Sequence, residues 1–203
     1  LLRTVWQYSK TIAQRIYTQM MQHFTIEEPS YNKPKVLPFT KIEEWSFTGL
    51  SDGERSYSEI IVPKTLIPKL IFTGFVKAAH RDYKFDSETE QIFATILEND
   101  SKVLRWLRPA PDQFRIYYDK NRRKYQPDFV VETEEGLYIV ETKSANMVGT
   151  EEVQQKKVAA ETFCEHATEY NKEHGKKPWR YLIIPHDQVT RTNTFEYLVQ
   201  VVG

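Results

Sequence analysis

The feature of this sequence that most constrains the fold is a pair of apolar runs separated by a short polar turn. The first run is Tyr125–Glu132, the second is Leu137–Lys143, and Glu134-Glu135-Gly136 lies between them. β-Branched and aromatic residues on both sides of a glycine-containing turn are typical of a β-hairpin. We therefore expect two antiparallel strands that bring the two ends of this segment together.

This hairpin gathers three charged side chains, whichever of two loops closes it. Glu141 and Lys143 are two residues apart, so they project from the same face of their strand. A Glu135-Gly136 loop pairs Asp128 with Lys143, whereas a Glu134-Glu135 loop pairs Asp128 with Glu141. Directly paired Cβ atoms lie about 4.5–5.5 Å apart and diagonal neighbours about 7–8 Å apart. Both registers place two carboxylates beside one ammonium group, an arrangement that suits a hard divalent cation.

Composition favours one globular, intracellular chain without a generally basic surface. The 203 residues are 40% hydrophobic and 13% aromatic, and 28 basic residues balance 28 acidic ones. Any contact with nucleic acid must therefore be local. The single cysteine, Cys164, excludes an internal disulfide and favours a reducing compartment, so we expect a cytoplasmic location. No apolar stretch reaches the length of a membrane span, so we expect no membrane partner.

The patterns along the rest of the chain predict a mixed α/β protein. The predicted segments are a helix over residues 3–24, irregular or edge-strand structure over 28–68, a helix over 87–99, a break over 105–111, a strand over 113–119, a helix over 151–173 ending near Gly175, a strand over 180–185 and a helix over 194–202. From Ser87 onward the order is helix, three consecutive strands, helix, strand. The fold is expected to place the hairpin next to both of the flanking helices.

The spacing of Pro127-Asp128 and Glu141-Thr142-Lys143, with this order of elements, resembles the PD-(D/E)xK nuclease superfamily. More narrowly, the chain resembles the C-terminal endonuclease domain of the Res subunit of type III restriction enzymes. The segments that carry the narrower resemblance are Lys84–Ala94, Tyr125–Phe129, Val140–Lys143, Lys156–Ala160 and Phe163-Cys164. The resemblance implies a restriction-endonuclease-like core of helix, three-stranded antiparallel meander, helix and strand over residues 84–203. Residues 1–83 would form an N-terminal helical and irregular extension.

The resemblance implies a Mg²⁺-dependent endonuclease, with Mn²⁺ as a substitute, that hydrolyses phosphodiester bonds in double-stranded DNA. Asp128 and Glu141 would bind the metal ion through their carboxylates, and Thr142 through its backbone carbonyl. Lys143 would hold the attacking water or stabilise charge on the phosphate. Glu90 on the helix before the strands and Lys156 on the helix after them complete the predicted catalytic set.

Each of these residues also has a structural interpretation. A salt bridge from Lys143 to Asp128 or Glu141 explains their placement without catalysis. Glu90 follows Ser87 by three residues, so the two can form a capping box in which the glutamate accepts from the N-cap amide. Lys156 can be ordinary solvated surface.

A basic turn precedes the Pro-Asp strand and is the predicted nucleic-acid contact. It contains Lys120, Arg122, Arg123 and Lys124. The tyrosines nearby, Tyr117, Tyr118 and Tyr125, are expected to meet sugars or bases. The alternative is a hairpin kept soluble by its charge.

The chain begins at Leu1 within an amphipathic pattern, so we expect a piece of a longer polypeptide. No Gly-x-x-x-x-Gly-Lys-Ser/Thr phosphate loop occurs, so this chain is not expected to hydrolyse ATP. The resemblance implies that ATP would act only through a motor domain of the same longer chain. The resemblance also implies a methyltransferase subunit as partner. Two alternatives stay open, namely a catalytically inactive nuclease-fold module for nucleic-acid binding or assembly, and a nuclease acting on RNA or single strands.

Overall fold

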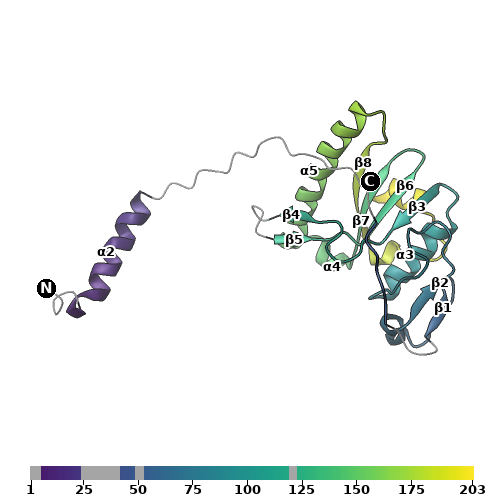
Figure 1. Cartoon of the computed structure of the whole chain (residues 1–203), viewed down its shortest axis with the longest axis horizontal. Helices are drawn as coiled ribbons and strands as arrows, with labels where there is room; N and C mark the ends of the chain where they lie inside the picture. Colours follow the sequence, from purple (N-terminus) through teal and green to yellow (C-terminus); the bar gives the residue numbers. More distant parts are fainter. Residues whose placement is uncertain (1–5, 24–41, 49–52, 119–122) are drawn as a thin grey trace. The chain divides into compact units, whose positions relative to one another are not determined.

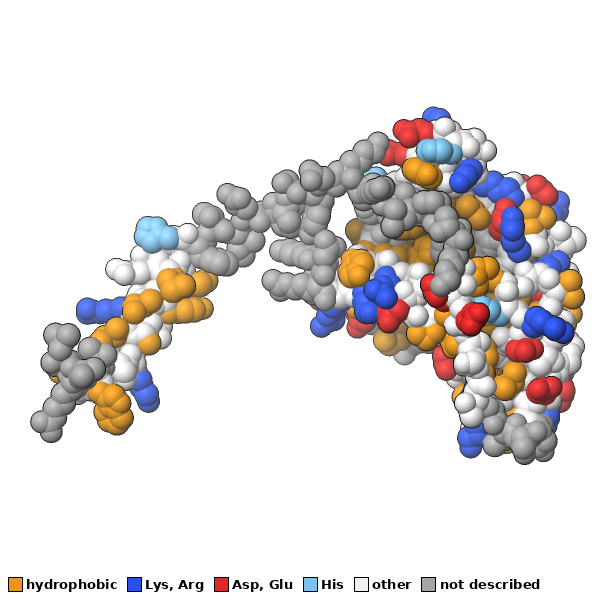
Figure 2. All heavy atoms as spheres, viewed as in Figure 1, with side chains coloured by type: hydrophobic (Ala, Val, Ile, Leu, Met, Phe, Trp, Pro, Cys, Tyr) orange, Lys and Arg blue, Asp and Glu red, His pale blue; other side chains and the backbone are white. Residues whose placement is uncertain are grey.

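The computed structural model describes residues 6–23, 42–48, 53–118 and 123–203. The chain divides into two compact units, Leu1–Lys35 and Val36–Gly203. The first unit contains helix α2, Ser9–Gln22, which confirms the predicted helix (Figure 1). None of its residues is buried. Ile16 and Met20 are among its exposed apolar side chains. Hydrophobic side chains are visible along the helix (Figure 2).

A four-stranded sheet forms the centre of the second unit (Figure 1). Its strands, in spatial order, are β3 (Val103–Leu107), β6 (Phe129–Thr133), β7 (Leu137–Lys143) and β8 (Trp179–Pro185). The first three are antiparallel, and β8 runs parallel to β7. The predicted hairpin is present as β6 and β7. The predicted α/β class is confirmed.

Helices cover the sheet on both faces, so β7 is buried on both sides. The helices of this unit are α3 (Glu88–Asn99), α4 (Ala145–Val148), α5 (Glu151–Glu173) and α6 (Phe195–Val202). Tyr138 and Val140 belong to the core that contains residues of α3 and α6, whereas Ile139 belongs to the core that contains residues of α5. None of the described helices combines the length and the hydropathy needed to cross a membrane.

Local sequence signals explain where these helices begin and end. Ser87 caps α3 and Thr194 caps α6, each by accepting a backbone N–H three residues on. The chain leaves α5 through Gly175 at φ +64°, a left-handed conformation that glycine adopts without steric cost.

The residues that precede α3 share the core of the sheet. They include the parallel pair β1 (Glu54–Ser56) and β2 (Ile71–Thr73) and the 3₁₀-helix η1 (Lys64–Lys69); a second 3₁₀-helix, η2 (His186–Gln188), follows β8. Phe75 and Tyr83 pack their rings against Trp106 of β3, at centroid distances of 5.2 and 5.1 Å. Residue 84 therefore marks where the sequence resemblance begins. It is not a boundary in the packing, which continues across it.

The buried carboxylate of Glu98 joins α3 to this preceding segment. It accepts hydrogen bonds from the backbone N–H groups of Val76 at 2.6 Å and Lys77 at 2.9 Å. It also accepts from Trp106 Nε1 at 3.0 Å. These three donors satisfy a charge that burial alone would make costly.

The predicted identity of the first sheet strand was wrong. We expected a break over 105–111 and placed the strand over 113–119 beside the hairpin. Instead β3 pairs with β6, because Val103 and Trp106 are buried against the core. The later strand is β4 (Ile116–Tyr118), which pairs with β5 (Arg123–Tyr125) in a separate two-stranded sheet. Ile116 and Tyr118 of β4 share a core cluster with Ala160 of α5.

Candidate active site

The hairpin loop fixes the register that brings Asp128 opposite Glu141. Phe129 pairs with Val140 in the sheet, so Asp128, the preceding residue, falls opposite Glu141. The loop is Glu134-Glu135, the second of the two predicted alternatives. Its turn is closed by Thr133, whose N–H donates to the Gly136 carbonyl at 2.9 Å. A Cβ at Gly136 would lie 3.2 Å from the Pro178 carbonyl oxygen, so a glycine suits this close approach.

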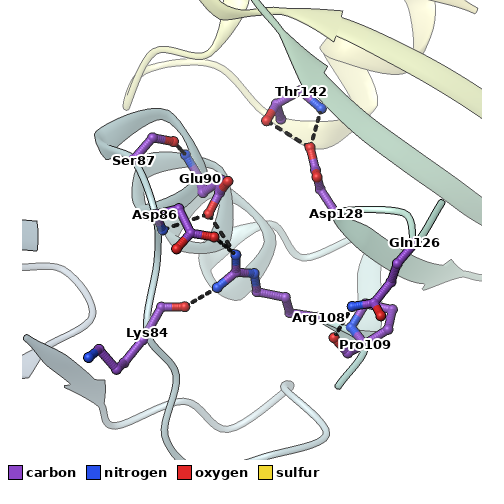
Figure 3. Close-up of polar contacts among 9 residues, drawn as sticks. All are labelled: Lys84, Asp86, Ser87, Glu90, Arg108, Pro109, Gln126, Asp128 and Thr142. Carbon is purple, nitrogen blue, oxygen red and sulfur yellow. Dashed lines mark hydrogen bonds and ion pairs between the residues drawn. The ribbon is translucent and has the colours of Figure 1, made fainter. Parts of the chain in front are cut away.

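Asp128 is held by Thr142 on the neighbouring strand. Its Oδ2 accepts from the Thr142 backbone N–H at 2.8 Å and from the Thr142 hydroxyl at 3.1 Å (Figure 3). Thr142 was predicted only as a carbonyl ligand, so its action as a double donor was missed. In the described part of the chain, Asp128 Oδ1 takes part in no hydrogen bond, and this oxygen is the one available to a ligand.

Glu141 is a buried carboxylate with one oxygen paired and one unsatisfied. Its side chain is 5% exposed, and its Oε2 lies 3.0 Å from Lys143 Nζ. Its Oε1 is buried and has no hydrogen-bond partner among the described residues. Burial raises the pKa of Glu141 to about 8, and the Asp128 charge adds to that effect while Lys143 opposes it. A buried oxygen without a partner is a position where a bound cation or a hydrogen-bond donor would be stabilising.

Lys143 extends from this buried pair toward solvent. Its side chain is 30% exposed, compared with 5% for Glu141. Burial lowers the pKa of Lys143, but the charges of Glu141 and Asp128 outweigh burial, so the pKa is raised overall. The amine is therefore a stable cation at the edge of the site. The predicted salt bridge of Lys143 exists, and it runs to Glu141.

Glu90 approaches the hairpin from α3 and is bound by Arg108. Glu90 Oε2 lies 3.0 Å from an Arg108 guanidinium nitrogen and accepts from the Asp86 N–H at 2.9 Å (Figure 3). Burial raises the pKa of Glu90, Arg108 lowers it, and the Asp128 charge raises it again. Glu90 is thus close enough to Asp128 to interact electrostatically. Its contacts, however, run to Arg108 and Asp86.

The predicted capping box is half present. The Ser87 hydroxyl accepts from the Glu90 N–H at 3.2 Å, as expected. The Glu90 carboxylate accepts from the Asp86 N–H instead of that of the N-cap residue Ser87. Arg108 explains the shift, because it pairs with both Glu90 and Asp86 and donates to the Lys84 carbonyl.

Lys156 lies on the side of α5 that faces the strands. Its Nζ lies 5.5 Å from the Tyr118 ring centroid and 5.9 Å from that of Tyr125, and it pairs with Glu152 at 2.7 Å. Its charge also lowers the pKa of Glu141, although less than Lys143 does. Lys157, the next residue, pairs with Glu161 instead. Of the two adjacent lysines, Lys156 is the one near the carboxylates.

Tyr125, which is buried, and Tyr181, which is partly buried, both interact with the charge of Glu141. Tyr125 donates to the Lys156 carbonyl at 3.3 Å. Burial raises the pKa of Tyr125, with smaller contributions from Tyr181 and Glu141. Burial and then the Glu141 charge raise the pKa of Tyr181. Tyr181 was missed, although a tyrosine within an apolar strand is a signal for a buried hydroxyl that needs a partner.

The predicted nucleic-acid contact is described only in part. Lys120 and Arg122 lie outside the described residues. Arg123 and Lys124 are exposed on β5, and Lys124 pairs with Asp112 at 2.6 Å. The tyrosine prediction needs correction, because strand alternation turns Tyr118 and Tyr125 inward beneath Lys156. Tyr117 is the exposed one, at 50%.

The donor chemistry at the hairpin fits a hard divalent cation. Among the described residues, no three His, Cys, Asp or Glu side chains are grouped as metal ligands. Two carboxylates do converge, and the buried Glu141 Oε1 and the Asp128 Oδ1 are the oxygens left for a ligand. Mg²⁺ is commonly held by one or two carboxylates and keeps several waters. The residues present are therefore sufficient for it.

Comparison of the chain with known protein families and with curated proteins found no match.

Proposed function

We propose that residues 84–203 form a metal-dependent DNA endonuclease domain that hydrolyses phosphodiester bonds. The observation that carries the proposal is the buried, unsatisfied Oε1 of Glu141 beside Asp128 and Lys143. An orphaned carboxylate oxygen next to a second carboxylate destabilises a fold unless a cation serves both. A metal ion bound beside the two carboxylates would supply the partner that this oxygen lacks.

The arrangement of elements also supports a PD-(D/E)xK nuclease core. A helix, α3, precedes the antiparallel strands β3, β6 and β7, and helix α5 leads to the parallel strand β8. This is the order that the resemblance implies, although its first strand is Val103–Leu107. The acid, gap and Glu-x-Lys pattern lies on the β6–β7 hairpin.

Each residue has a definite task in this mechanism. Asp128 and Glu141 would hold Mg²⁺, with the Thr142 carbonyl as a further donor; such an ion would supply a water of lowered pKa and charge compensation for the phosphate. Lys143 orients the attacking water and stabilises the charge that develops on the phosphoryl oxygens. Glu90 adds negative potential from α3, and Lys156 supplies positive charge from α5.

The proposed substrate is double-stranded DNA, contacted in part by the exposed Arg123 and Lys124. In the resembled enzymes an ATP-driven motor precedes the nuclease and a methyltransferase subunit reads the sequence. Both are proposed partners, with the motor domain part of the same longer chain.

Plasmid cleavage with Mg²⁺ and Mn²⁺ tests the proposal. Asp128→Ala and Lys143→Ala are each expected to reduce the cleavage rate by about 100-fold or more. Lys157→Ala is the matched control, because this lysine pairs with Glu161 away from the site. Undiminished cleavage by both site variants would remove this mechanism.

Calorimetric titration with Mn²⁺ distinguishes the inactive-module alternative. The Glu141–Lys143 ion pair at 3.0 Å favours that alternative, because it orders the hairpin without any metal ion. The catalytic reading requires Mn²⁺ binding that Asp128→Ala abolishes and Lys157→Ala preserves. An inactive module that folds normally and binds no Mn²⁺ gives the opposite result.

A further inference from the structure

The outer edge of the four-stranded sheet is open along β8. In the described part of the chain β8 has β7 as its one strand neighbour. Leu137 of β7 pairs with Trp179 and donates its N–H to the Pro178 carbonyl at 2.8 Å. In a parallel ladder, alternate residues of a strand direct their backbone N–H and C=O groups toward the neighbouring strand, and the residues between them direct these groups away from it. Trp179, Tyr181 and Ile183 therefore turn these groups outward.

Helix α5 closes only the first of these outward positions. The Thr168 hydroxyl accepts from the Trp179 N–H at 2.8 Å and donates to the Trp179 carbonyl at 3.2 Å. For the backbone groups of Tyr181 and Ile183, no such partner is present within residues 6–23, 42–48, 53–118 and 123–203. A row of unpaired strand groups is a template for another strand.

A groove of about 440 Å³ runs over this edge. One wall is α5, with Glu161, Cys164 and Glu165, and the other is the end of α6, with Val199 and Gly203. The β8 residues that line the groove are Trp179–Leu182, and Ile183 is the next residue along the strand. An extended chain advances about 3.3 Å per residue, so this edge accommodates roughly three or four residues. Two helices, α5 and α6, therefore flank the open edge of β8.

The groove carries an excess of negative charge. Glu161 and Glu165 lie one turn apart on α5 and are exposed, and Arg180 is the basic residue that lines the same groove. Glu161 has a distant ion pair with Lys157 at 3.8 Å. Burial raises the pKa of Cys164 to about 12, and the charges of Glu161 and Glu165 add to it.

We propose that the groove over β8 binds an extended segment of a partner protein, rich in lysine or arginine, which pairs with Tyr181 and Ile183 as a fifth strand of the sheet. Main-chain hydrogen bonds supply the pairing, and the alternate basic side chains meet Glu161 and Glu165. This docking surface uses the outward edge of β8, whereas Ile183 pairs with the site residue Glu141 on the inward side of the same strand.

Fluorescence anisotropy with the full chain tests the proposal. The probe is a fluorescein-labelled hexapeptide of alternating lysine and valine. Two further probes carry N-methyl groups on one or the other alternate set of amides. A chain that adds as a strand uses only one set, so we expect one methylated peptide to lose about tenfold or more in affinity and the other to bind like the parent. A peptide with glutamate in place of lysine should bind at least about tenfold more weakly.

Variants of β8 provide the second arm. Ile183→Pro removes an outward N–H that the β7 ladder does not use, and it should weaken the lysine–valine peptide about tenfold. Ile183→Val keeps the donor and should bind normally. If Ile183→Pro does not fold, the two methylated peptides still test whether the bound chain pairs as a strand.

Equal binding of all the lysine peptides, or no saturable binding, would overturn the proposal. So would a peptide-free dimer in sedimentation velocity that Ile183→Pro abolishes, because that result assigns the edge to a second copy of the chain.

Discussion

The carboxylate of Asp128 is anchored at one oxygen by both hydrogen-bond donors of a single residue, Thr142. The backbone N–H contributes a bond of 2.8 Å and the hydroxyl one of 3.1 Å. Since Thr142 lies between Glu141 and Lys143, the strand that supplies these two groups also orients the opposing acid. The spacing between the acids is therefore set within the hairpin.

Replacing the Thr142 hydroxyl tests this anchoring. Thr142→Val removes one bond to a carboxylate and should lower the free energy of unfolding by about 1–2 kcal/mol. It should also weaken Mn²⁺ binding about tenfold, since it loosens a ligand. Thr142→Ser keeps the donor and should resemble the wild type in urea unfolding and calorimetry. Equal losses in the two variants would show that the hydroxyl does not act through Asp128.

The stability of the metal-free protein should fall as the pH rises from about 4.5 to about 8. Burial raises the pKa of Glu141 to about 8 from a usual value of 4.5. Between these values the folded state holds a proton that the unfolded chain releases, so the free energy of unfolding decreases with pH. Glu141→Gln cannot ionise and should gain about 1–3 kcal/mol at pH 8 with a flatter profile. Urea titrations in EDTA at pH 5 and pH 8 measure this.

Glu132 is the matched control for that experiment. Burial raises its pKa, but hydrogen bonds from Lys177 and Arg105 outweigh burial, so the pKa is lowered overall. The stability that Glu132 contributes is present above the usual pKa of a glutamate. It is lost as the pH falls through the lowered pKa of Glu132 in the folded protein. Glu132→Gln should therefore destabilise the protein at neutral pH. A gain in stability from both glutamine variants would contradict the assigned directions of the two pKa shifts.

Arg108 and Glu90 should be strongly coupled in a double-mutant cycle. The two side chains are each 13% exposed and lie 3.0 Å apart. Arg108→Met leaves a buried carboxylate without its cation and should lower the free energy of unfolding by about 3 kcal/mol. Adding Glu90→Gln should restore much of the loss. Losses that simply add in urea unfolding would show that the pair is not a coupled unit.

Glu98→Gln should destabilise the core far more than Glu88→Gln on the same helix. Glu98 accepts from Val76, Lys77 and Trp106, and an amide in its place directs an NH₂ group at donors. We expect a loss of about 1–3 kcal/mol. Glu88 forms an ion pair with the exposed Lys64, so its variant should stay within about 0.5 kcal/mol. Thermal unfolding of the two variants side by side provides the measurement.

The elements that the sequence predicted well are those with local signals. The β6–β7 hairpin has a turn between two apolar runs, and α5 has a long periodic stripe and a terminal glycine. β3 was missed because Arg105 interrupts its five residues and Pro109 follows closely. Its pairing with β6 depends on contacts far apart in the chain, which a local pattern cannot report.

The sequence was sufficient to predict which charged side chains converge at the candidate site. It was less informative about the residues that bind and orient them. Asp128, Glu141 and Lys143 share one hairpin, so alternation and register were enough. The role of Arg108 could not be predicted from the sequence, because only the packing of α3 against the sheet brings Glu90 next to it. Thr142 gave no signal, since a threonine in a strand is ordinary until its neighbour across the ladder is known.

Because Glu141, Thr142 and Lys143 are consecutive and Asp128 is bonded to the middle one, these side chains move together when the surrounding helices fluctuate. Partial opening of α5 would change how solvent reaches these groups, while the distances among the groups persist. The helices thus govern access and electrostatic potential, and the hairpin alone governs alignment.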